Sequence, residues 1–422
     1  MRIAILRAKG GNLSSLSFIH AADLHLDSPF IGLQQVDEEI ARRLRNATFE
    51  AFDNLIQSAL EHKVDFLLVA GDVYDSADSS IRAQFRFRDG LAKLASHGIP
   101  SYVIHGNHDP LDRWIPTLDW PSQVKIFQAD DEQHHPFHKD GKAVARIHGI
   151  SYPTKSVSAK FGRKFQRSGS EPFQIGLFHC NLNGDPRHGD YAPRTLDELR
   201  QCNLDYWALG HVHERKVVSE GGPFVAYPGN LQGRHVREAG ARGAMLIRAN
   251  QSGVVAHDFL PLDTVRWEHL KIGIENLSSV DALVSRVQDV LCADGRSLIA
   301  RISLVGRGPL YRDLARDATG ILSVVRERCT DSASPHFVWV ERLENRTKPD
   351  IDLQQRAERE DFVGTLLRLA ADFAPENVDD ALKALWENSR AKKFLGGLEE
   401  SDRQEILERA IALVSDSLLE DE

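Results

Sequence analysis

The sequence predicts an α/β sandwich, followed by a small α+β unit and a helical C-terminal segment. Two observations predict the sandwich. Through residues 18–109, short apolar runs alternate with stretches in which apolar side chains recur at helical spacing. These apolar runs end in polar residues, and open α/β sheets present their sites at the carboxyl ends of their strands. A third observation, the change of pattern after residue 262, indicates a second domain.

The bulk composition is that of a globular protein with more than one domain. The chain has 422 residues, of which 42% are hydrophobic and 27% charged. It has no apolar run long enough to span a membrane, and its first residues are too weakly apolar for a secretory signal. The 4 cysteines lack a CxxC spacing, which favours buried thiols in a reducing cytoplasm. A net charge of −9 excludes a generally basic nucleic-acid binder, so DNA contacts would come from local patches.

The first domain is expected over residues 17–262. Residues 1–16 carry little pattern and are interpreted as an N-terminal extension, or as the product of an upstream start codon. The predicted elements are, in order, a strand at 18–23, a helix at 40–59, a strand at 64–70, a helix at 81–94 and a strand at 102–104, then strands at 143–150, 173–178, 206–209 and 224–227. The second half of this domain is therefore expected to be richer in β-structure than the first.

A smaller α+β domain is expected over residues 263–345, and a polar linker over 346–358. The elements predicted for the small domain are a strand at 267–274, an amphipathic helix at 280–291, a strand at 298–305, a short helix at 310–315 and a strand at 337–340. Residues 359–422 have helical periodicity throughout. They are expected either to dock a partner or to form a self-contained bundle packed on the small domain.

The polar residues at the strand ends form one chemical set. Its members are Asp23, His25, Asp72, Asn107, His108, His179, His211 and His213. Oxygen and imidazole ligands without thiolates suit Mn²⁺, Fe²⁺ or Zn²⁺. Excluding His108, the candidate ligands are too many for one tetrahedral ion and indicate two, with Asp72 as the natural bridge. Two such ions hold a bridging hydroxide as nucleophile and clamp the oxygens of an in-line phosphoryl displacement.

The loop Gly106-Asn107-His108-Asp109 divides this chemistry between neighbouring residues. Asn107 offers a carbonyl oxygen to a cation, and His108 offers a proton donor to whatever the cation binds. Taken singly, an Asp-x-His sequence after a strand is usually an ordinary loop, and one histidine at a strand end is more often a satisfied polar residue than a ligand. Their coincidence in five loops, each at the end of an apolar strand, favours the metal centre.

These motifs together resemble the calcineurin-like metallophosphoesterases. The motifs are Asp23-Leu24-His25, Gly71-Asp72, the loop at 106–109, His179 and Gly210-His211-Val212-His213. The resemblance covers about residues 17–262 and implies a four-layer αββα sandwich with two divalent ions, expected to be Mn²⁺, with Fe²⁺ or Zn²⁺ as alternatives. It implies that one ion is held by Asp23, His25, Asp72 and His213, and the other by Asp72, Asn107, His179 and His211. It further implies that His108 stabilises the transition state or protonates the leaving oxygen, and that Asp75 orients His108. A helix cap is the alternative role for Asp75.

Within this superfamily, residues 18–27 and 70–75 resemble the DNA repair exonucleases of the SbcD type, and residues 227–235 resemble their YhaO branch. The resemblance implies a phosphodiesterase that hydrolyses DNA as a 3′–5′ exonuclease with single-strand endonuclease activity. It implies a capping role for residues 263–345 and docking of an SbcC-type coiled-coil ATPase on residues 359–422. It also implies a homodimer. The sequence contains no P-loop, so ATP binding is expected to belong to the partner.

Basic side chains near the metal-site segments are the candidates for DNA phosphate contacts. They are Lys155, Lys164, Arg215, Arg234 and His235. Solvated surface is the alternative explanation for such charges. The acidic C-terminal end would repel DNA, which suits a role in docking protein.

Three functions remain open at this point. The first is the DNA phosphodiesterase, and the second is a phosphatase or phosphodiesterase of small molecules or phosphoproteins. The third is a non-catalytic scaffold with the same fold. The cap and helical tail disfavour the second, because a compact substrate needs neither. The complete ligand set disfavours the third, because a scaffold has no physical need for it.

Overall fold

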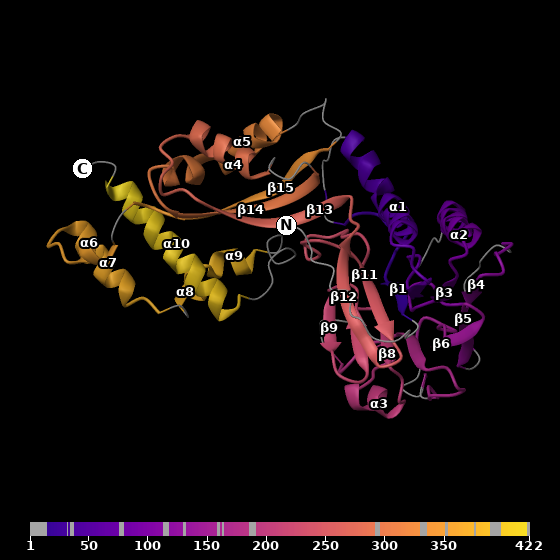
Figure 1. The fold of residues 1–422 in the computed structure, drawn as a ribbon. Coiled ribbons are helices and arrows are strands. Elements are labelled where there is room, and N and C mark those ends of the chain that lie inside the picture. The colour runs from indigo at the N-terminus through magenta and orange to yellow at the C-terminus, as the bar shows by residue number, and fades with distance from the viewer. Residues whose placement is uncertain are drawn as a thin grey trace. The chain divides into compact units, whose positions relative to one another are not determined.

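The computed structural model divides the chain into two compact units (Figure 1). The first comprises Met1–Glu268 with Gly295–Ile299 and Pro335–Phe337, and the second comprises the remainder. The structure describes residues 15–419 except 32, 34–37, 76–79, 113–117, 130–131, 158–160, 163, 185–190, 292–295, 330–335, 351–352, 375–376 and 389–397. Among the described helices, none is long and apolar enough to cross a membrane.

Two six-stranded sheets form the first unit. The strands of the first sheet, in spatial order, are β12 (Gly253–Pro261), β11 (Gly243–Asn250), β1 (Leu16–Ala21), β2 (Phe66–Ala70), β3 (Ser101–Ile104) and β4 (Val124–Ile126). Strands β1 to β4 are parallel, whereas β11 runs antiparallel to both β1 and β12. The parallel register brings the carboxyl ends of β1, β2 and β3 to the same edge of this sheet.

The second sheet repeats this arrangement with a parallel centre. Its strands, in spatial order, are β5 (Gln133–Lys139), β6 (Lys142–Gly149), β7 (Phe173–His179), β8 (Tyr206–Gly210), β10 (Phe224–Tyr227) and β9 (Lys216–Ser219). Strands β6, β7, β8 and β10 are parallel, and β5 and β9 close the two edges in antiparallel fashion. Continuous apolar runs such as β7 and β8 suit strands that are buried on both faces.

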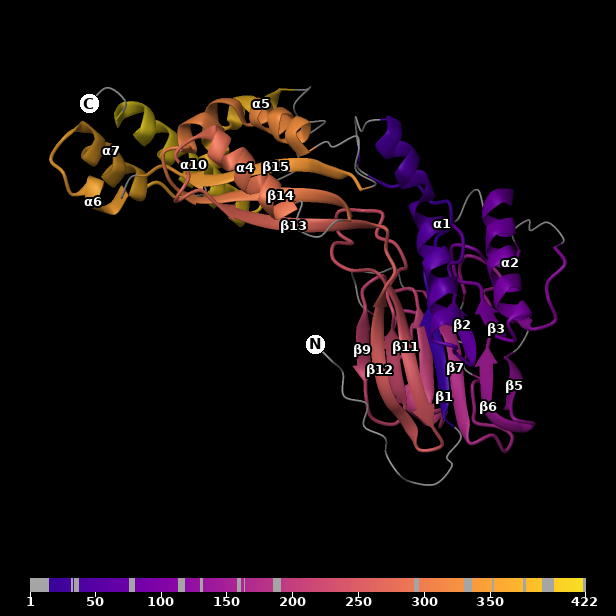
Figure 2. The ribbon, with the colours of Figure 1, turned by 45° about the horizontal axis from the view of Figure 1, so that its top comes forward.

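Side chains on opposite faces of each sheet pack into different cores, and these cores define the layers of the first unit. Phe18 belongs to the core between the sheets, whereas its neighbour Ile19 packs with α1 (Glu38–Glu61) and α2 (Ile81–Ser96) on the outer face of the first sheet. Figure 2 shows these two helices side by side. On the outer face of the second sheet, the short helix α3 (Leu196–Gln201) and adjoining loops cover another core. The predicted four-layer αββα sandwich is therefore confirmed.

A buried histidine links the two sheets. His20 on β1 has no exposed surface, and its Nδ1 and Nε2 lie 2.9 Å from the Tyr206 hydroxyl and 3.1 Å from the Leu209 carbonyl. Because a carbonyl only accepts, Nε2 carries the proton and Nδ1 accepts from Tyr206. Burial lowers the pKa of His20 to about 3, so the side chain is neutral at physiological pH.

A three-stranded sheet of β13 (Val265–Gly273), β14 (Ser297–Arg307) and β15 (Val338–Lys348) carries the α+β part of the chain. Helix α4 (Val280–Leu291) follows β13, and helix α5 (Tyr311–Cys329) follows β14. After β15 the chain forms the helices α6 (Leu353–Ala357), α7 (Phe362–Ala371), α8 (Asn377–Ala381), α9 (Lys383–Glu387) and α10 (Glu400–Leu419). The helix expected at 310–315 is only the first part of α5, which is kinked at Asp317 (φ −148°, ψ 62°) and continues as a second helical part to Cys329. Strand β15 and α6 also enter the stretch expected as a linker, because pairing with β14 holds polar residues in a strand.

Candidate metal centre

The strand ends of both sheets bring the predicted side chains together. Asp23 and His25 follow β1, Asp72 follows β2, and Asn107 and His108 follow β3. From the second sheet, His179 is the last residue of β7, and His211 and His213 follow β8. Except for His108 and His213, these side chains are buried. A buried set of carboxylates and imidazoles needs either mutual hydrogen bonds or cations.

The backbone of this site lies in a conformation that few residue types adopt. Asp23, His25, Asp72 and His211 have positive φ angles of 51°, 43°, 49° and 103°. Such angles are uncommon outside glycine, although aspartate, asparagine and histidine tolerate them best. Strained residues of this kind cluster at functional sites, where the surrounding structure holds them in place.

Three glycines, Gly71, Gly106 and Gly210, make room for the imidazole of His179. A Cβ atom on Gly106 would lie 2.2 Å from Oδ1 of Asp72 and 2.9 Å from Cε1 of His179. A Cβ atom on Gly210 would lie 1.8 Å from the Ala70 carbonyl oxygen and 2.8 Å from Nδ1 of His179. The glycines that precede Asn107 and His211 are therefore required by close approach to the site.

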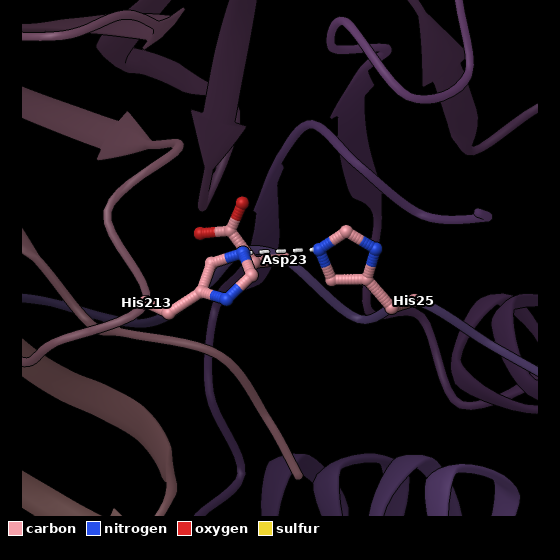
Figure 3. Close-up of side chains that lie close together, drawn as sticks. All are labelled: Asp23, His25 and His213. Atoms are coloured by element: carbon pink, nitrogen blue, oxygen red, sulfur yellow. Dashed lines mark hydrogen bonds between the residues drawn. The ribbon is translucent and has the colours of Figure 1, made fainter. Parts of the chain in front are cut away.

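The first cluster of candidate ligands contains Asp23, His25 and His213 (Figure 3). Nε2 of His25 lies 3.1 Å from Nε2 of His213. Nδ1 of His213 lies 2.6 Å from Oε1 of Glu238, and a carboxylate can only accept, so His213 carries its proton on Nδ1. Its Nε2 lone pair therefore faces His25. Among the described residues, Nδ1 of His25 has no hydrogen-bond partner.

The second cluster contains Asp23, Asp72 and His179. Nδ1 of His179 lies 2.9 Å from the Ala70 carbonyl oxygen, to which it must donate. In the neutral imidazole, Nε2 then presents a lone pair 3.0 Å from Oδ1 of Asn107 and 3.4 Å from Oδ2 of Asp72. Three acceptors converge on one point, which is the arrangement that a cation stabilises.

His211 lies next to the second cluster. Its imidazole lies 5.3 Å from that of His179 and 5.4 Å from the Tyr191 ring, measured between centroids. Its backbone N–H lies 3.1 Å from each carboxylate oxygen of Asp23, so the same residue also fixes a candidate ligand from the first sheet.

The titration of the carboxylates reflects this crowding. Burial raises the pKa of Asp23 to about 6, even though His213 and His179 oppose the shift. Burial would also raise the pKa of Asp72, but the charge and hydrogen bond of His179 hold it well below its ordinary value. The same pairing raises the pKa of His179 to about 9 in spite of its burial. A divalent cation would replace that proton as the positive charge between Asp72 and His179.

The two clusters fit divalent cations because their nitrogen and oxygen lone pairs face one another. Both fixed tautomers, in His179 and His213, turn a lone pair toward other acceptors, and this ligand geometry is the usual one for histidine supported from behind by a carbonyl or carboxylate. Asp72 lies between the clusters, since Oδ2 is 3.4 Å from His179 Nε2 and 4.0 Å from His25 Nε2. The site therefore has the composition and the geometry to hold two ions.

A third group of potential ligands contains His25, Asp75 and His108. Nδ1 of His108 lies 2.8 Å from Oδ1 of Asp75, and Nη1 of Arg234 lies 3.2 Å from Oδ2 of the same carboxylate. The guanidinium already supplies the positive charge that a metal would bring, so we assign a hydrogen-bonded pair rather than a third ion. Burial would lower the pKa of His108, but Asp75 and Asp72 outweigh it and raise the pKa above its ordinary value.

Comparison with known proteins agrees with this geometry. The family model described as "Calcineurin-like phosphoesterase" matches residues 16–215, and that described as "Metallophosphoesterase YhaO, middle domain" matches residues 267–348. The chain is 34% identical to "Uncharacterized metallophosphoesterase YhaO" of Bacillus subtilis, over 94% of this chain and 97% of that protein. The chain belongs to the calcineurin-like phosphoesterase family.

More distant calcineurin-like relatives carry a different name. The chain is 26% identical to "DNA double-strand break repair protein Mre11" of Methanopyrus kandleri, over 58% of this chain and 57% of that protein. It is 24% identical to the Mre11 of Methanocaldococcus jannaschii, over 65% of this chain and 73% of that protein. Members of the calcineurin-like fold use a dinuclear metal centre, and the chain is accordingly a metal-dependent phosphoester hydrolase.

The basic residues singled out in the sequence of this calcineurin-like protein lie in different surroundings. Lys155, Lys164 and Arg215 are exposed, and the Arg215 guanidinium lies over the Phe259 ring at 4.3 Å from its centroid. His235 is half-buried. The Arg234 side chain is only 9% exposed and faces Asp75. Arg234 is therefore buried beside Asp75 and does not lie on an accessible surface.

Glu238, which accepts a hydrogen bond from His213, was not predicted from the sequence. No local sequence pattern indicates this contact, because the two residues are 25 positions apart. The only available signal is a general one: a histidine that binds metal through one ring nitrogen usually donates its other N–H to a carboxylate or carbonyl.

Proposed function

We propose that this protein is a two-metal phosphodiesterase that hydrolyses DNA in DNA repair, acting in the cytoplasm as a 3′–5′ exonuclease with single-strand endonuclease activity. The observation that carries the phosphodiesterase is the pair of neighbouring ligand clusters, with Asp72 between them, beside the hydrogen-bonded His108–Asp75 pair. The name of the Mre11 relatives supports DNA as the substrate.

We propose the following ligands for the two ions. Asp23, His25, Asp72 and His213 hold one, and Asp72, Asn107, His179 and His211 hold the other. Bound divalent ions, Mn²⁺ above all, supply the positive charge that acidifies water and neutralises phosphoryl oxygens. The chain itself supplies orientation, since the Ala70 carbonyl and Glu238 fix which nitrogen of His179 and His213 faces the centre.

His108 acts on the substrate in this proposal. With a raised pKa and its Nδ1–H directed to Asp75, the imidazole keeps Nε2 for the phosphoryl group or the leaving oxygen. When protonated, it donates a proton to the leaving alkoxide, as a general acid does. Asp75 stabilises the imidazolium and fixes the ring, which matches its position on the Nδ1 side.

Three other parts of the chain contribute to this function. Lys155, Lys164, Arg215 and His235 are proposed to contact DNA phosphates. The domain over residues 263–345 is proposed as the cap that helps to bind DNA, and it overlaps most of the match to the YhaO middle domain at residues 267–348. It follows the catalytic domain at 17–262 and precedes the helical region.

The helical region over residues 359–422 is proposed to dock the coiled coil of an SbcC-type ATPase. Helices α7, α8 and α10 lie together (Figure 1). Their side chains line an apolar groove of about 480 Å³. Phe362, Leu369 and Leu413 are 71%, 65% and 51% exposed. Large apolar side chains at such exposure favour a partner surface. A homodimer is proposed as well, and light scattering of the purified protein tests it.

A time course on end-labelled duplex and single-stranded DNA tests the proposed function. Reactions contain Mn²⁺, Mg²⁺ or EDTA, and Asp72→Asn serves as the control. We expect cleavage that depends on Mn²⁺ and disappears in the control, with a product ladder that gives the polarity. Hydrolysis of bis-p-nitrophenyl phosphate without DNA cleavage would favour a small-molecule or phosphoprotein substrate. Inactivity on both would favour a scaffold, or an enzyme that needs its ATPase.

A further inference from the structure

We propose that the loop from Arg234 to Glu238 is a single positioning element for both halves of the catalytic centre. Glu238 orients the ligand His213, and Arg234 orients the Asp75 that holds His108. This inference rests on the proposed function, because it assigns the loop a task in that same site.

Glu238 connects the metal side to the loop itself. Its Oε1 accepts from Nδ1 of His213 at 2.6 Å, and its Oε2 accepts from the backbone N–H of Arg234 at 2.7 Å. The carboxylate is largely buried, with 15% of the side chain exposed. A short, buried, charge-assisted hydrogen bond restricts the rotation of the imidazole and makes its free nitrogen a better ligand.

Arg234, at the other end of the loop, contacts Asp75. Its Nη1 lies 3.2 Å from Oδ2 of Asp75, which also accepts from the Ser28 hydroxyl at 2.9 Å. The second oxygen of Asp75, Oδ1, accepts a hydrogen bond from Nδ1 of His108 at 2.8 Å. His108 and Arg234 therefore occupy opposite oxygens of one carboxylate, and a shift of Arg234 would turn the carboxylate away from His108.

The conformation of the loop is set by further contacts. The N–H of Glu238 donates to the His235 carbonyl at 2.8 Å, and Nε of Arg242 donates to the Glu238 carbonyl at 3.1 Å. A Cβ atom on Gly233 would lie 2.7 Å from that same Glu238 carbonyl oxygen, so the chain closes tightly on itself. The Arg234 carbonyl in turn accepts from the N–H of Ile31 at 2.9 Å. The loop is thus held at both ends by contacts within the chain.

The burial of Arg234 argues for positioning over direct DNA contact. The guanidinium is enclosed, and among the described residues its Nε has no hydrogen-bond partner. Arginine suits this task because its planar group fixes a carboxylate in direction as well as in charge. Among the described residues, the exposed Arg215 instead stacks over the Phe259 ring.

Four variants of the full chain test the proposal: Glu238→Gln, Glu238→Ala, Arg234→Lys and Arg234→Met. Calorimetric titration with Mn²⁺ alone measures metal affinity, and steady-state hydrolysis of bis-p-nitrophenyl phosphate separates kcat from KM. Glu238→Ala is expected to weaken Mn²⁺ binding by ~10- to 100-fold, the range for loss of a carboxylate behind a ligand histidine, with partial rescue in Glu238→Gln, which keeps an acceptor. Circular dichroism and thermal melts confirm that each variant is folded.

The arginine variants should have the opposite signature. Arg234→Met is expected to leave Mn²⁺ affinity within about threefold of the wild type while lowering kcat by ~10-fold or more at an unchanged KM, the effect of a lost transition-state contact. Arg234→Lys is expected to recover part of kcat. Wild-type Mn²⁺ affinity in Glu238→Ala, or an Arg234→Met variant with normal kcat, would overturn the proposal. Should Glu238→Ala not fold, the same comparison is made between Glu238→Gln and the wild type.

These outcomes separate the loop from the proposed function. If the wild type itself neither binds Mn²⁺ nor hydrolyses the ester, the metal centre is wrong and the loop proposal falls with it. If the wild type does both and the variants match it, only the loop proposal fails.

Discussion

Nδ1 of His108 and Oδ1 of Asp75 lie 2.8 Å apart, and this hydrogen bond joins a loop after β3 to a loop after β2. It leaves the opposite nitrogen of the imidazole for another partner. Neither His108 nor Asp75 is among the ligands proposed for the two ions. Our proposal therefore assigns proton transfer and metal binding to different side chains.

The variant His108→Ala is expected to keep its metal ions and lose most of its turnover. We expect kcat to fall by ~10²- to 10⁴-fold, the usual contribution of a general acid. Mn²⁺ affinity should stay near the wild-type value, since none of the ligands assigned to either ion is changed. Calorimetry and phosphodiester hydrolysis on the same preparation check both. Loss of metal binding in this variant would contradict the assignment of His108.

The close approach at Gly106 leads to a second expectation. In Gly106→Ala, the added methyl group would overlap Oδ1 of Asp72 and press on His179, so the second ion should bind at least ~10-fold more weakly, and overpacking of this kind destabilises by about 1–3 kcal/mol. Gly221→Ala is the matched control, because no described atom outside its chain neighbours lies within 4 Å of the position of its Cβ. Equal Mn²⁺ affinity in the two variants would refute the steric argument.

Removal of divalent ions should destabilise the first unit. An ion that binds only the folded state, present at 100 times its dissociation constant, adds about 2.7 kcal/mol to the free energy of unfolding. Excess EDTA should therefore lower the melting temperature of the wild type, and Mn²⁺ should restore it. Asp72→Asn should respond much less to either addition. A wild type whose melting temperature ignores both would argue against metal binding.

His20 should make the free energy of unfolding depend on pH. Its folded pKa of about 3 lies below the unfolded value of 6.5, so the unfolded chain binds more protons between these two values. The contribution of the neutral side chain is complete above pH 6.5 and is lost as the pH falls toward 3, by up to about 1.4 kcal/mol per pH unit. His20→Gln keeps a donor and an acceptor but does not titrate.

Urea denaturation of the two proteins at several pH values measures this effect. The wild type should lose stability relative to His20→Gln as the pH falls from 7 to 5, with the other histidines common to both. Parallel pH profiles would show that His20 is not the titrating group.

The exposed apolar side chains of the helical region provide a further test. Phe362→Glu and Leu413→Glu change residues that are 71% and 51% exposed, so neither should alter the melting temperature much. Both should weaken binding to an SbcC-type coiled coil, by at least ~10-fold if the surface is the interface. Val255→Glu, at a position 65% exposed in the other unit, is the control. Unchanged binding in both test variants would place the interface elsewhere.

How far the sequence predicts this fold depends on how each strand is buried. Strands β1, β2, β7 and β8 are buried on both faces, so their apolar runs are continuous and were predicted close to their observed bounds. The edge strands β5 and β12 contain only exposed and half-buried positions, and neither was predicted from the sequence. Strand β11 was also missed, although it pairs with β1 near the centre of its sheet.

The site shows the same division between local and distant information. Its candidate ligands were found because each stands at the end of a recognisable strand. The supporting residues Glu238 and Arg234 were not assigned their contacts, because these depend on chain segments that meet only in the folded protein. The alternation of apolar residues contains no signal for a contact between two loops.

The positive φ angles of Asp23, His25, Asp72 and His211 restrict the sequence as strongly as the ligand chemistry does. Aspartate and histidine are among the few non-glycine residues that tolerate such backbone angles, and they are also the residues that bind hard and borderline cations. Valine or isoleucine at these positions would therefore be unsuitable for two reasons. Neither side chain can bind a cation, and a β-branched residue disfavours a positive φ angle. Even a descendant that no longer hydrolysed phosphoesters would be expected to retain aspartate, asparagine, histidine or glycine there. Residue identity at these four positions is consequently a weaker sign of activity than the identity of His108, whose backbone imposes no such restriction.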